Sequence, residues 1–160
     1  QIDRVRIFST DERLHMMFTN PDTGENRAHD GCIHEIGRRT MGYMVRIFDV
    51  AGYFRMQNRC QYPVRCPFVL ALQVEDDFIE DNNRTFLLSI SGSQISLVEH
   101  AQPDVTLSIG ISALSSVVMG AYSLRDAIDY GLAELSNPAY TADVQSAIGW
   151  DKKPVNVTYF

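Results

Sequence analysis

The sequence predicts an α+β fold, in which an antiparallel sheet of about five strands is covered by helices on one face. Three observations lead to this fold class. Apolar runs of strand length occupy the middle of the 160-residue chain, and runs with helical spacing follow them. A Gly-Ser pair at residues 92–93 separates two of the strand-like runs, which is a hairpin signal. Strands and helices that are segregated along a chain are typical of such a layered arrangement.

The first part of the chain mixes strand and helix patterns. Residues 2–9 alternate apolar and charged side chains and predict a strand, and residues 10–18 carry apolar residues at helical spacing. A polar loop follows, and then residues 32–41, which fit one or two helical turns or an irregular segment. Residues 42–50 predict a strand that is apolar on both faces, with Arg46 paired if it lies inside.

A short helix is expected next, at residues 51–58, and the remainder predicts a strand meander followed by helices. The expected strands are residues 67–76, 85–91, 94–100 and 105–111. Helical spacing over residues 112–135, broken near Gly120 and Ser123, predicts two helices. Residues 137–150 predict a third, with Asn137 as its cap and Pro138 in its first turn. Residues 155–160 can form only a short terminal strand or an extended tail.

Composition and charge exclude several classes of protein. The net charge of −6 and the pI of about 5.1 argue against nucleic-acid binding. Apolar runs all fall short of the roughly 18 residues that span a bilayer. Three cysteines without framework spacing favour reduced thiols in the cytoplasm. The first residue is Gln1, so we expect the sequence to begin inside a longer protein.

Two clusters of polar residues resemble metal sites but are better explained without a metal. Residues 29–35, HDGCIHE, contain five possible ligands, but structural zinc sites usually have ligand pairs at two separate places. The acidic run at residues 75–81 lacks the central glycine of a calcium loop, which favours a solvated loop between strands. No nucleophile elbow, phosphate loop or dinucleotide fingerprint is present. We therefore expect no metal and no complete catalytic centre in this sequence.

Asp49 and the chain end are the candidate site residues. Asp49 follows an apolar run, where a carboxylate can cap the helix after it or form the anionic wall of a pocket for an amine. The chain ends in two aromatic residues, Tyr159 and Phe160, which can anchor the tail as an edge strand. Aromatic surface would also desolvate the terminal carboxylate of Phe160, which raises its pKa and makes it a better base.

Several stretches together resemble the enhanced-intracellular-survival (Eis) type of acetyltransferase. GYMVRIFDV and PFVLALQVEDDFIEDNNRTFLLSISG are similar to the start of that family's C-terminal domain. PDVTLSIGISALSSVVMGAYSLRDAIDYGLAEL is similar to its next part, and the closing YF to its chain end. The resemblance covers residues 43–160, and residues 1–42 look like the end of the family's central domain.

This resemblance implies an N-acetyltransferase of the Gcn5-related (GNAT) superfamily. The family has an acetyl-CoA-binding N-terminal domain, a central domain of the same fold, and a C-terminal domain resembling sterol carrier protein. Residues 1–42 would then end the central domain, and residues 43–160 would form the sterol-carrier-like domain. The carboxylate of Phe160 would act as the base, and Asp49 would be an acid of the acceptor pocket.

The resemblance has two departures from the family pattern. The acetyl-CoA signature is absent, so this chain alone is expected to be inactive. Tyr159 stands where some aminoglycoside-modifying members carry an acid. The acceptor is therefore open between an amine-bearing small molecule and a peptide or protein lysine.

Two other roles fit the sequence. The first is a lipid-binding module, in which helix residues would line an apolar cavity; these residues are Val117, Val118, Met119, Leu124 and Ile128. An ordinary filled core at these positions is favoured over such a cavity. A free sheet face or an edge tail could instead support a structural role, including a homo-oligomer.

Overall fold

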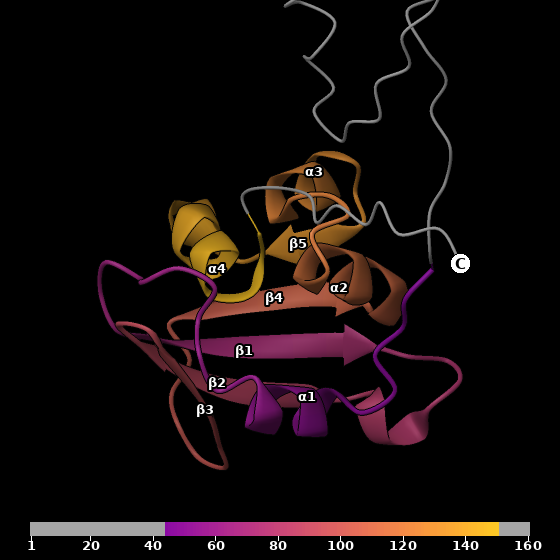
Figure 1. The fold of residues 1–160 in the computed structure, drawn as a ribbon, viewed down its shortest axis with the longest axis horizontal. Helices are drawn as coiled ribbons and strands as arrows, with labels where there is room; N and C mark the ends of the chain where they lie inside the picture. The colour runs from indigo at the N-terminus through magenta and orange to yellow at the C-terminus, as the bar shows by residue number, and fades with distance from the viewer. Residues whose placement is uncertain (1–43, 151–160) are drawn as a thin grey trace, which may run out of the picture. The chain divides into compact units, whose positions relative to one another are not determined.

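The structure, a computed structural model, describes residues 44–150 (Figure 1). The first helix is α1, Val50–Met56. The strands are β1 Phe68–Glu75, β2 Thr85–Ser91, β3 Gln94–Val98, β4 Val105–Gly110 and β5 Ala133–Leu135. The later helices are α2 Ile111–Val118, α3 Leu124–Asp129 and α4 Thr141–Ile148. Short 3-10 turns lie at Glu80–Asn82 and Pro138–Tyr140.

The five strands form one sheet in the order β3-β2-β1-β4-β5, with β1 at its centre (Figure 1). The β1–β2, β2–β3 and β4–β5 pairs are antiparallel, as expected, but β1 and β4 pair in parallel. The chain therefore leaves the predicted meander after β3 and returns beside β1. Asp104 fixes this return, because its N–H donates to the carbonyl of Val69 and its carboxylate accepts from the N–H of Val69.

The helices cover one face of the sheet, as the sequence predicts. Alternate strand residues such as Leu70, Leu88 and Leu107 are fully buried, and they share one core with buried residues of all four helices. Burying one such side chain contributes about 1.5–3 kcal/mol. The opposite face carries exposed or half-buried residues such as Gln73 and Ser89. This alternation is what a period of two produces in a half-covered sheet.

Local signals in the sequence place several elements correctly. The β2–β3 hairpin turns at residues 92–93, where Gly92 takes a φ of +57° that favours glycine. Ser123 and Asp126 form a capping box at the start of α3. Asn137 accepts a hydrogen bond from the N–H of Ala139 ahead of Pro138. The turn after Asn137 is 3-10, and the regular helix begins at Thr141.

Two strand predictions are wrong. Residues 44–49 of the expected strand at 42–50 form neither strand nor helix. Their apolar alternation does not report burial, because Met44, Val45 and Phe48 are exposed. The fifth strand is instead β5, which lies in the stretch expected to end the second helix. Gly131, with φ +70°, turns the chain out of α3 and into pairing with β4.

Parts of the sequence predictions concern residues outside the described range. These are the elements expected over residues 2–41, the HDGCIHE segment, the domain boundary at residues 42–43, and the terminal strand with Tyr159 and Phe160. Among the helices between residues 44 and 150, none has the length and apolar character to cross a membrane.

Candidate functional site

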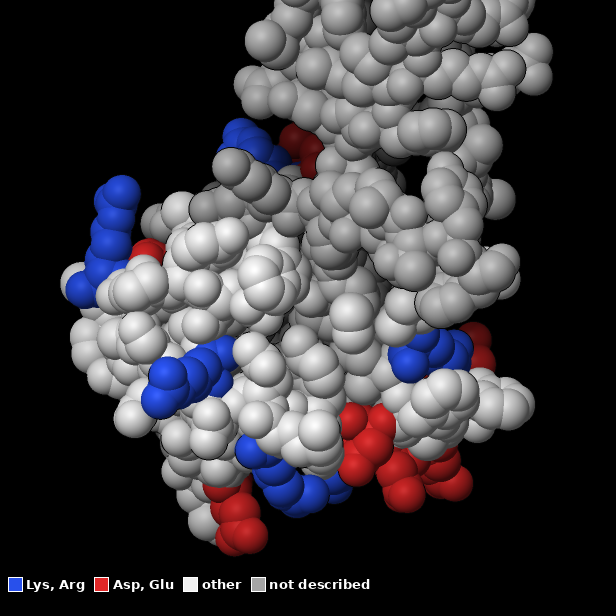
Figure 2. Space-filling model, in the orientation of Figure 1, with Lys and Arg blue, Asp and Glu red and all other residues white. Residues whose placement is uncertain are grey.

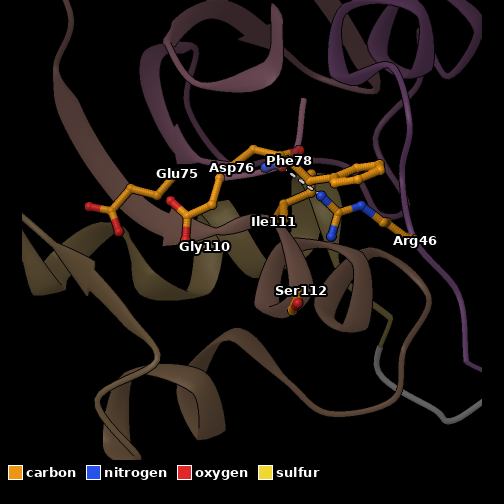
Figure 3. A pocket seen from close by; sticks show the side chains of 8 residues that line it. Arg46, Glu75, Asp76, Phe78, Gly110, Ile111 and Ser112 are labelled. Atoms are coloured by element: carbon orange, nitrogen blue, oxygen red, sulfur yellow. Dashed lines mark hydrogen bonds and ion pairs between the residues drawn. The ribbon is translucent and has the colours of Figure 1, made fainter. Parts of the chain in front are cut away.

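A pocket of about 300 Å³ lies at the edge of the sheet where β1 and β4 end (Figure 3). These strands are parallel, so their carboxyl ends lie at the same edge. Residues after β1, the first turn of α2 and the extended segment before α1 line the pocket. The lining residues are Arg46, Glu75, Asp76, Asp77, Phe78, Gly110, Ile111 and Ser112.

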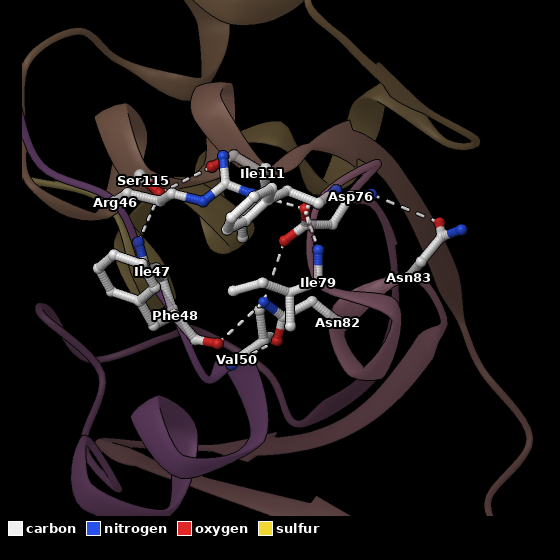
Figure 4. Close-up of polar contacts among 11 residues, drawn as sticks. Arg46, Ile47, Phe48, Val50, Asp76, Ile79, Asn82, Asn83, Ile111 and Ser115 are labelled. Carbon is white, nitrogen blue, oxygen red and sulfur yellow. Dashed lines mark hydrogen bonds and ion pairs between the residues drawn. The ribbon is translucent and has the colours of Figure 1, made fainter.

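Asp76 is the buried carboxylate of this pocket, with 3% of its surface exposed. Its Oδ1 accepts hydrogen bonds from the N–H groups of Phe78 at 2.9 Å and Ile79 at 3.0 Å. The same oxygen accepts from Nη2 of Arg46 at 2.5 Å, and Oδ2 accepts from Nδ2 of Asn82 at 3.1 Å (Figure 4). A buried charge with this many donors is satisfied, which corrects the expectation of a fully solvated acidic loop.

These contacts set the protonation state of Asp76. Burial by itself would raise the pKa of the carboxyl group. The hydrogen bonds from Asn82, Ile79 and Phe78 and the charge of Arg46 outweigh burial and hold the pKa of Asp76 below its ordinary value. Asp76 is therefore ionised at neutral pH. A carboxylate with a lowered pKa is a poor general base, so its chemistry here is to hold neighbouring groups in place.

The lowered pKa predicts a specific acid sensitivity. A group whose pKa falls on folding adds stability above its unfolded pKa of about 4, and that stability is lost as the pH drops through the folded value. We expect the urea concentration at the midpoint of unfolding to decrease as the pH is lowered below about 4. Asp76→Asn should lack this part of the slope, whereas the exposed neighbour variant Asp77→Asn should retain it. Equal slopes in both variants would rule out Asp76 as the source.

Arg46 belongs to the extended segment before α1, and its side chain reaches into the pocket. Its side chain is 32% exposed, pairs with Asp76 and lies over the ring of Phe78, 5.7 Å from the ring centre. The expected pairing of Arg46 is thus confirmed, although the residue lies in an extended segment rather than a strand. Its Nε is buried and makes no hydrogen bond among the described residues.

The mouth of the pocket is acidic. Glu75 and Asp77 are exposed there, and acidic side chains gather over the loop that follows β1 (Figure 2). Exposed carboxylates suit a cationic group better than an anion. Within residues 44–150, no three His, Cys, Asp or Glu side chains come together as a metal site.

Asp49 is the N-cap of α1, which confirms the capping interpretation. Its Oδ1 accepts a hydrogen bond from the N–H of Gly52 at 2.7 Å. A Cβ at position 52 would meet the carboxylate of Asp49, so a larger residue there would push this side chain out of its capping position. Asp49 is exposed and is not among the residues that line the pocket. The other two candidate site residues, Tyr159 and Phe160, lie outside the described residues.

The helix residues considered for a lipid cavity are mostly part of the core. Val117, Val118 and Leu124 are buried in it, and Ile128 packs against it. Met119 is 37% exposed and lies outside that cluster. These contacts favour the filled core over a cavity at these positions.

Sequence reasoning missed two polar residues of this region. Asn82 looked like one more member of an acidic, solvated loop, yet it is 2% exposed. Ser115 lies within an apolar helix, and its burial follows from its position on the covered face of α2. Neither residue belongs to a motif, so only the tertiary contacts identify them.

Fold and family comparisons agree with this architecture. A family model for the sterol carrier protein domain matches residues 58–156. The match covers more than half of the chain, and the chain belongs to this family. A search of curated proteins gave no match.

Several solved structures share the fold. Eis1 from Mycobacterium abscessus is 21% identical with a TM-score of 0.50, over 69% of this chain and 26% of that one. A GCN5-related N-acetyltransferase from Anabaena variabilis is 18% identical with a TM-score of 0.55, over 68% and 26%. One from Kribbella flavida is 16% identical with a TM-score of 0.55, over 72% and 28%. The chain thus spans about a quarter of these proteins, and the resemblance stated from sequence is confirmed for the fold.

Proposed function

We propose that this chain is the C-terminal portion of a GNAT N-acetyltransferase that transfers acetyl from acetyl-CoA to an amine. The observation that supports this most is the fold match to Eis1 and to two GCN5-related N-acetyltransferases. Each match covers about a quarter of the larger protein, as one domain of a multidomain chain would. Under this proposal, acetyl-CoA is bound outside the sequence described here.

The proposed reaction is a direct acyl transfer. The base first takes a proton from the ammonium group, and the freed amine nitrogen then attacks the thioester carbonyl and forms the C–N bond. The C–S bond breaks, and the leaving CoA thiolate takes up the second proton from the nitrogen. Donors in the acetyl-CoA-binding part would stabilise the oxyanion. The terminal carboxylate of Phe160 would be the base, and the ring of Tyr159 would contact the acceptor and help to exclude water.

The acceptor is proposed to be cationic before it reacts. Candidates are an amine-bearing small molecule and a lysine of a peptide or protein. The net charge of −6 and the acidic side chains near the end of β1 would attract either of them. We also propose a cytoplasmic location, which the cysteine usage favours, and a homo-oligomer, whose contacts a free sheet face or an edge tail would provide.

An assay of CoA release tests this function. The protein is expressed with whatever precedes Gln1 in its gene, and thiol release from acetyl-CoA is followed with and without a panel of amines and lysine peptides. We expect saturable, amine-dependent release and an acetylated product by mass spectrometry. Acetyl-CoA that neither binds by calorimetry nor transfers its acetyl group to any amine would contradict the proposal.

Asp49→Asn tests the proposed second role of the N-cap. Asparagine caps helices as well as aspartate does, so stability should be nearly unchanged, whereas the charge is lost. An exposed ion pair is worth up to about 1 kcal/mol, so KM for a cationic amine should rise roughly twofold to fivefold with little change in kcat.

The controls for Asp49 separate charge from capping. Glu99→Gln removes an exposed charge outside the loop that follows β1 and should leave KM unchanged. Asp49→Ala should cost about 1 kcal/mol of stability, because the cap is lost as well. An unchanged KM in Asp49→Asn would leave this residue with capping as its sole role.

A further inference from the structure

The segment of residues 44–49 is fixed in an unusual way for a stretch without regular structure. Its backbone pairs with no strand, and its apolar side chains are largely exposed. Instead, side chains from two distant elements bind it (Figure 4). One is α2, and the other is the loop between β1 and β2. Both are more than 25 residues away along the chain.

Four contacts from three side chains hold successive points of the segment and of the helix start that follows it. Oγ of Ser115 accepts from the N–H of Ile47 at 3.0 Å, inside the core. Nδ2 of Asn82 donates to the carbonyl of Phe48 at 3.1 Å, and Oδ1 of Asn82 accepts from the N–H of Val50 at 3.0 Å. Asp76 binds the guanidinium of Arg46.

The buried polar side chains of the described residues all bind the same short segment. Between residues 44 and 150 three polar side chains are buried: Asp76 at 3%, Asn82 at 2% and Ser115 at 0% exposure. All three bind the same short stretch, residues 46–50. Asn82 also donates to Asp76, and Ser115 donates to the carbonyl of Ile111 at 2.7 Å, so each is satisfied. Buried polar groups are tolerated when they are bonded in this way.

We propose that Asp76, Asn82 and Ser115 form a clamp that fixes the direction in which the chain enters the sterol-carrier domain. The clamp sits next to the predicted domain boundary at residues 42–43. Its consequence for activity rests on the proposed function: the base would be at the end of this domain while acetyl-CoA is bound elsewhere. A misplacement of about 1 Å costs on the order of a hundredfold in rate. The three are therefore positioning residues.

Amide exchange measured by NMR on the 160-residue chain tests the clamp directly. Ser115→Ala removes the acceptor for Ile47, and we expect exchange of the Ile47 amide to accelerate roughly fivefold to tenfold. Ser116→Ala is the matched control, because Ser116 also donates to the carbonyl four residues earlier but makes no hydrogen bond to residues 44–50. It should leave Ile47 unchanged.

A second variant tests the hydrogen bonds that Asn82 makes to this segment. Asn82→Ala should accelerate the Val50 amide by a similar factor and speed tryptic cleavage after Arg46, whereas Asp81→Ala, at its exposed neighbour, should do neither. The strand amides of Leu72 and Leu88 report whether the fold is intact, and Ser115→Ala decides the question if Asn82→Ala does not fold. Exchange at Ile47 and Val50 within twofold of the parent would overturn the clamp.

Measurements of kcat in the same variants separate this proposal from the proposed function. In an enzyme that transfers acetyl, Ser115→Ala should lower kcat by at least fivefold without changing the Kd for acetyl-CoA, and Ser116→Ala should change neither. An unaltered kcat alongside faster Ile47 exchange would overturn the positioning role and leave a local clamp. A protein without acetyl transfer leaves the exchange result standing, because that readout involves no reaction.

Discussion

Asp76→Asn is expected to destabilise the domain by about 3 kcal/mol, the range found when one partner of a buried ion pair is removed. The change is nearly isosteric, so loss of packing contributes little. It replaces a carboxylate oxygen, which accepts hydrogen bonds, with an amide –NH₂ group, which only donates them. Oδ1 of Asp76 faces three donors and Oδ2 faces the Asn82 amide, so the new group meets a donor in either orientation.

Arg46 determines how much of this loss is recovered. Its side chain is about one-third exposed, so the unpaired guanidinium can reach water in the variant, which limits the penalty. The backbone N–H groups of Phe78 and Ile79 have no such route if they stay buried. We therefore expect the loss of stability to come mainly from the loop after β1.

Thermal and urea unfolding measure this effect. For a domain of about this size, a loss of 3 kcal/mol lowers Tm by roughly 10–15 °C. Asp77→Asn removes the same charge from an exposed neighbour and should shift Tm by no more than about 2 °C. A Tm for Asp76→Asn close to that of Asp77→Asn would mean that the buried carboxylate is dispensable.

Local patterns predicted most of the fold. The hairpin at Gly92, the capping box at Ser123 and the Asn137–Pro138 start were readable because each signal lies within a few residues. The parallel β1–β4 pair was not readable, since it depends on where the chain goes after β3. The contact of Asp104 with Val69 joins residues 35 apart, and no local propensity encodes it.

The site was less predictable than the fold. Asp49 was found because an N-cap is a local feature, and the pairing of Arg46 was expected because a charge among apolar residues needs a partner. Its partner Asp76 was hidden among other acids of the same loop. Asn82 and Ser115 gave no signal, because burial of a lone polar residue is decided by tertiary packing. The alternation at residues 44–49 was misleading for the same reason.

Extending the chain beyond Phe160 should have the largest effect on activity. Two or three added residues, for example Gly-Ser-Gly, move the terminal carboxylate away and place an amide at Phe160. A positioned general base contributes roughly 10²–10⁴ in rate, so kcat should fall by about that factor. The Kd for acetyl-CoA should not change, since the cofactor would be bound elsewhere. The same residues inserted in the exposed loop between His100 and Ala101 are a matched control for added length.

The most direct test of the central claim is kcat of the complete enzyme with Phe160 as the free acid and as the C-terminal amide. Amidation replaces one oxygen and removes the charge without adding a residue, so folding and acetyl-CoA binding should be preserved. A loss of about a hundredfold or more in kcat, with the Kd for acetyl-CoA unchanged, is the predicted result. Equal turnover of acid and amide would contradict a catalytic role for the chain end.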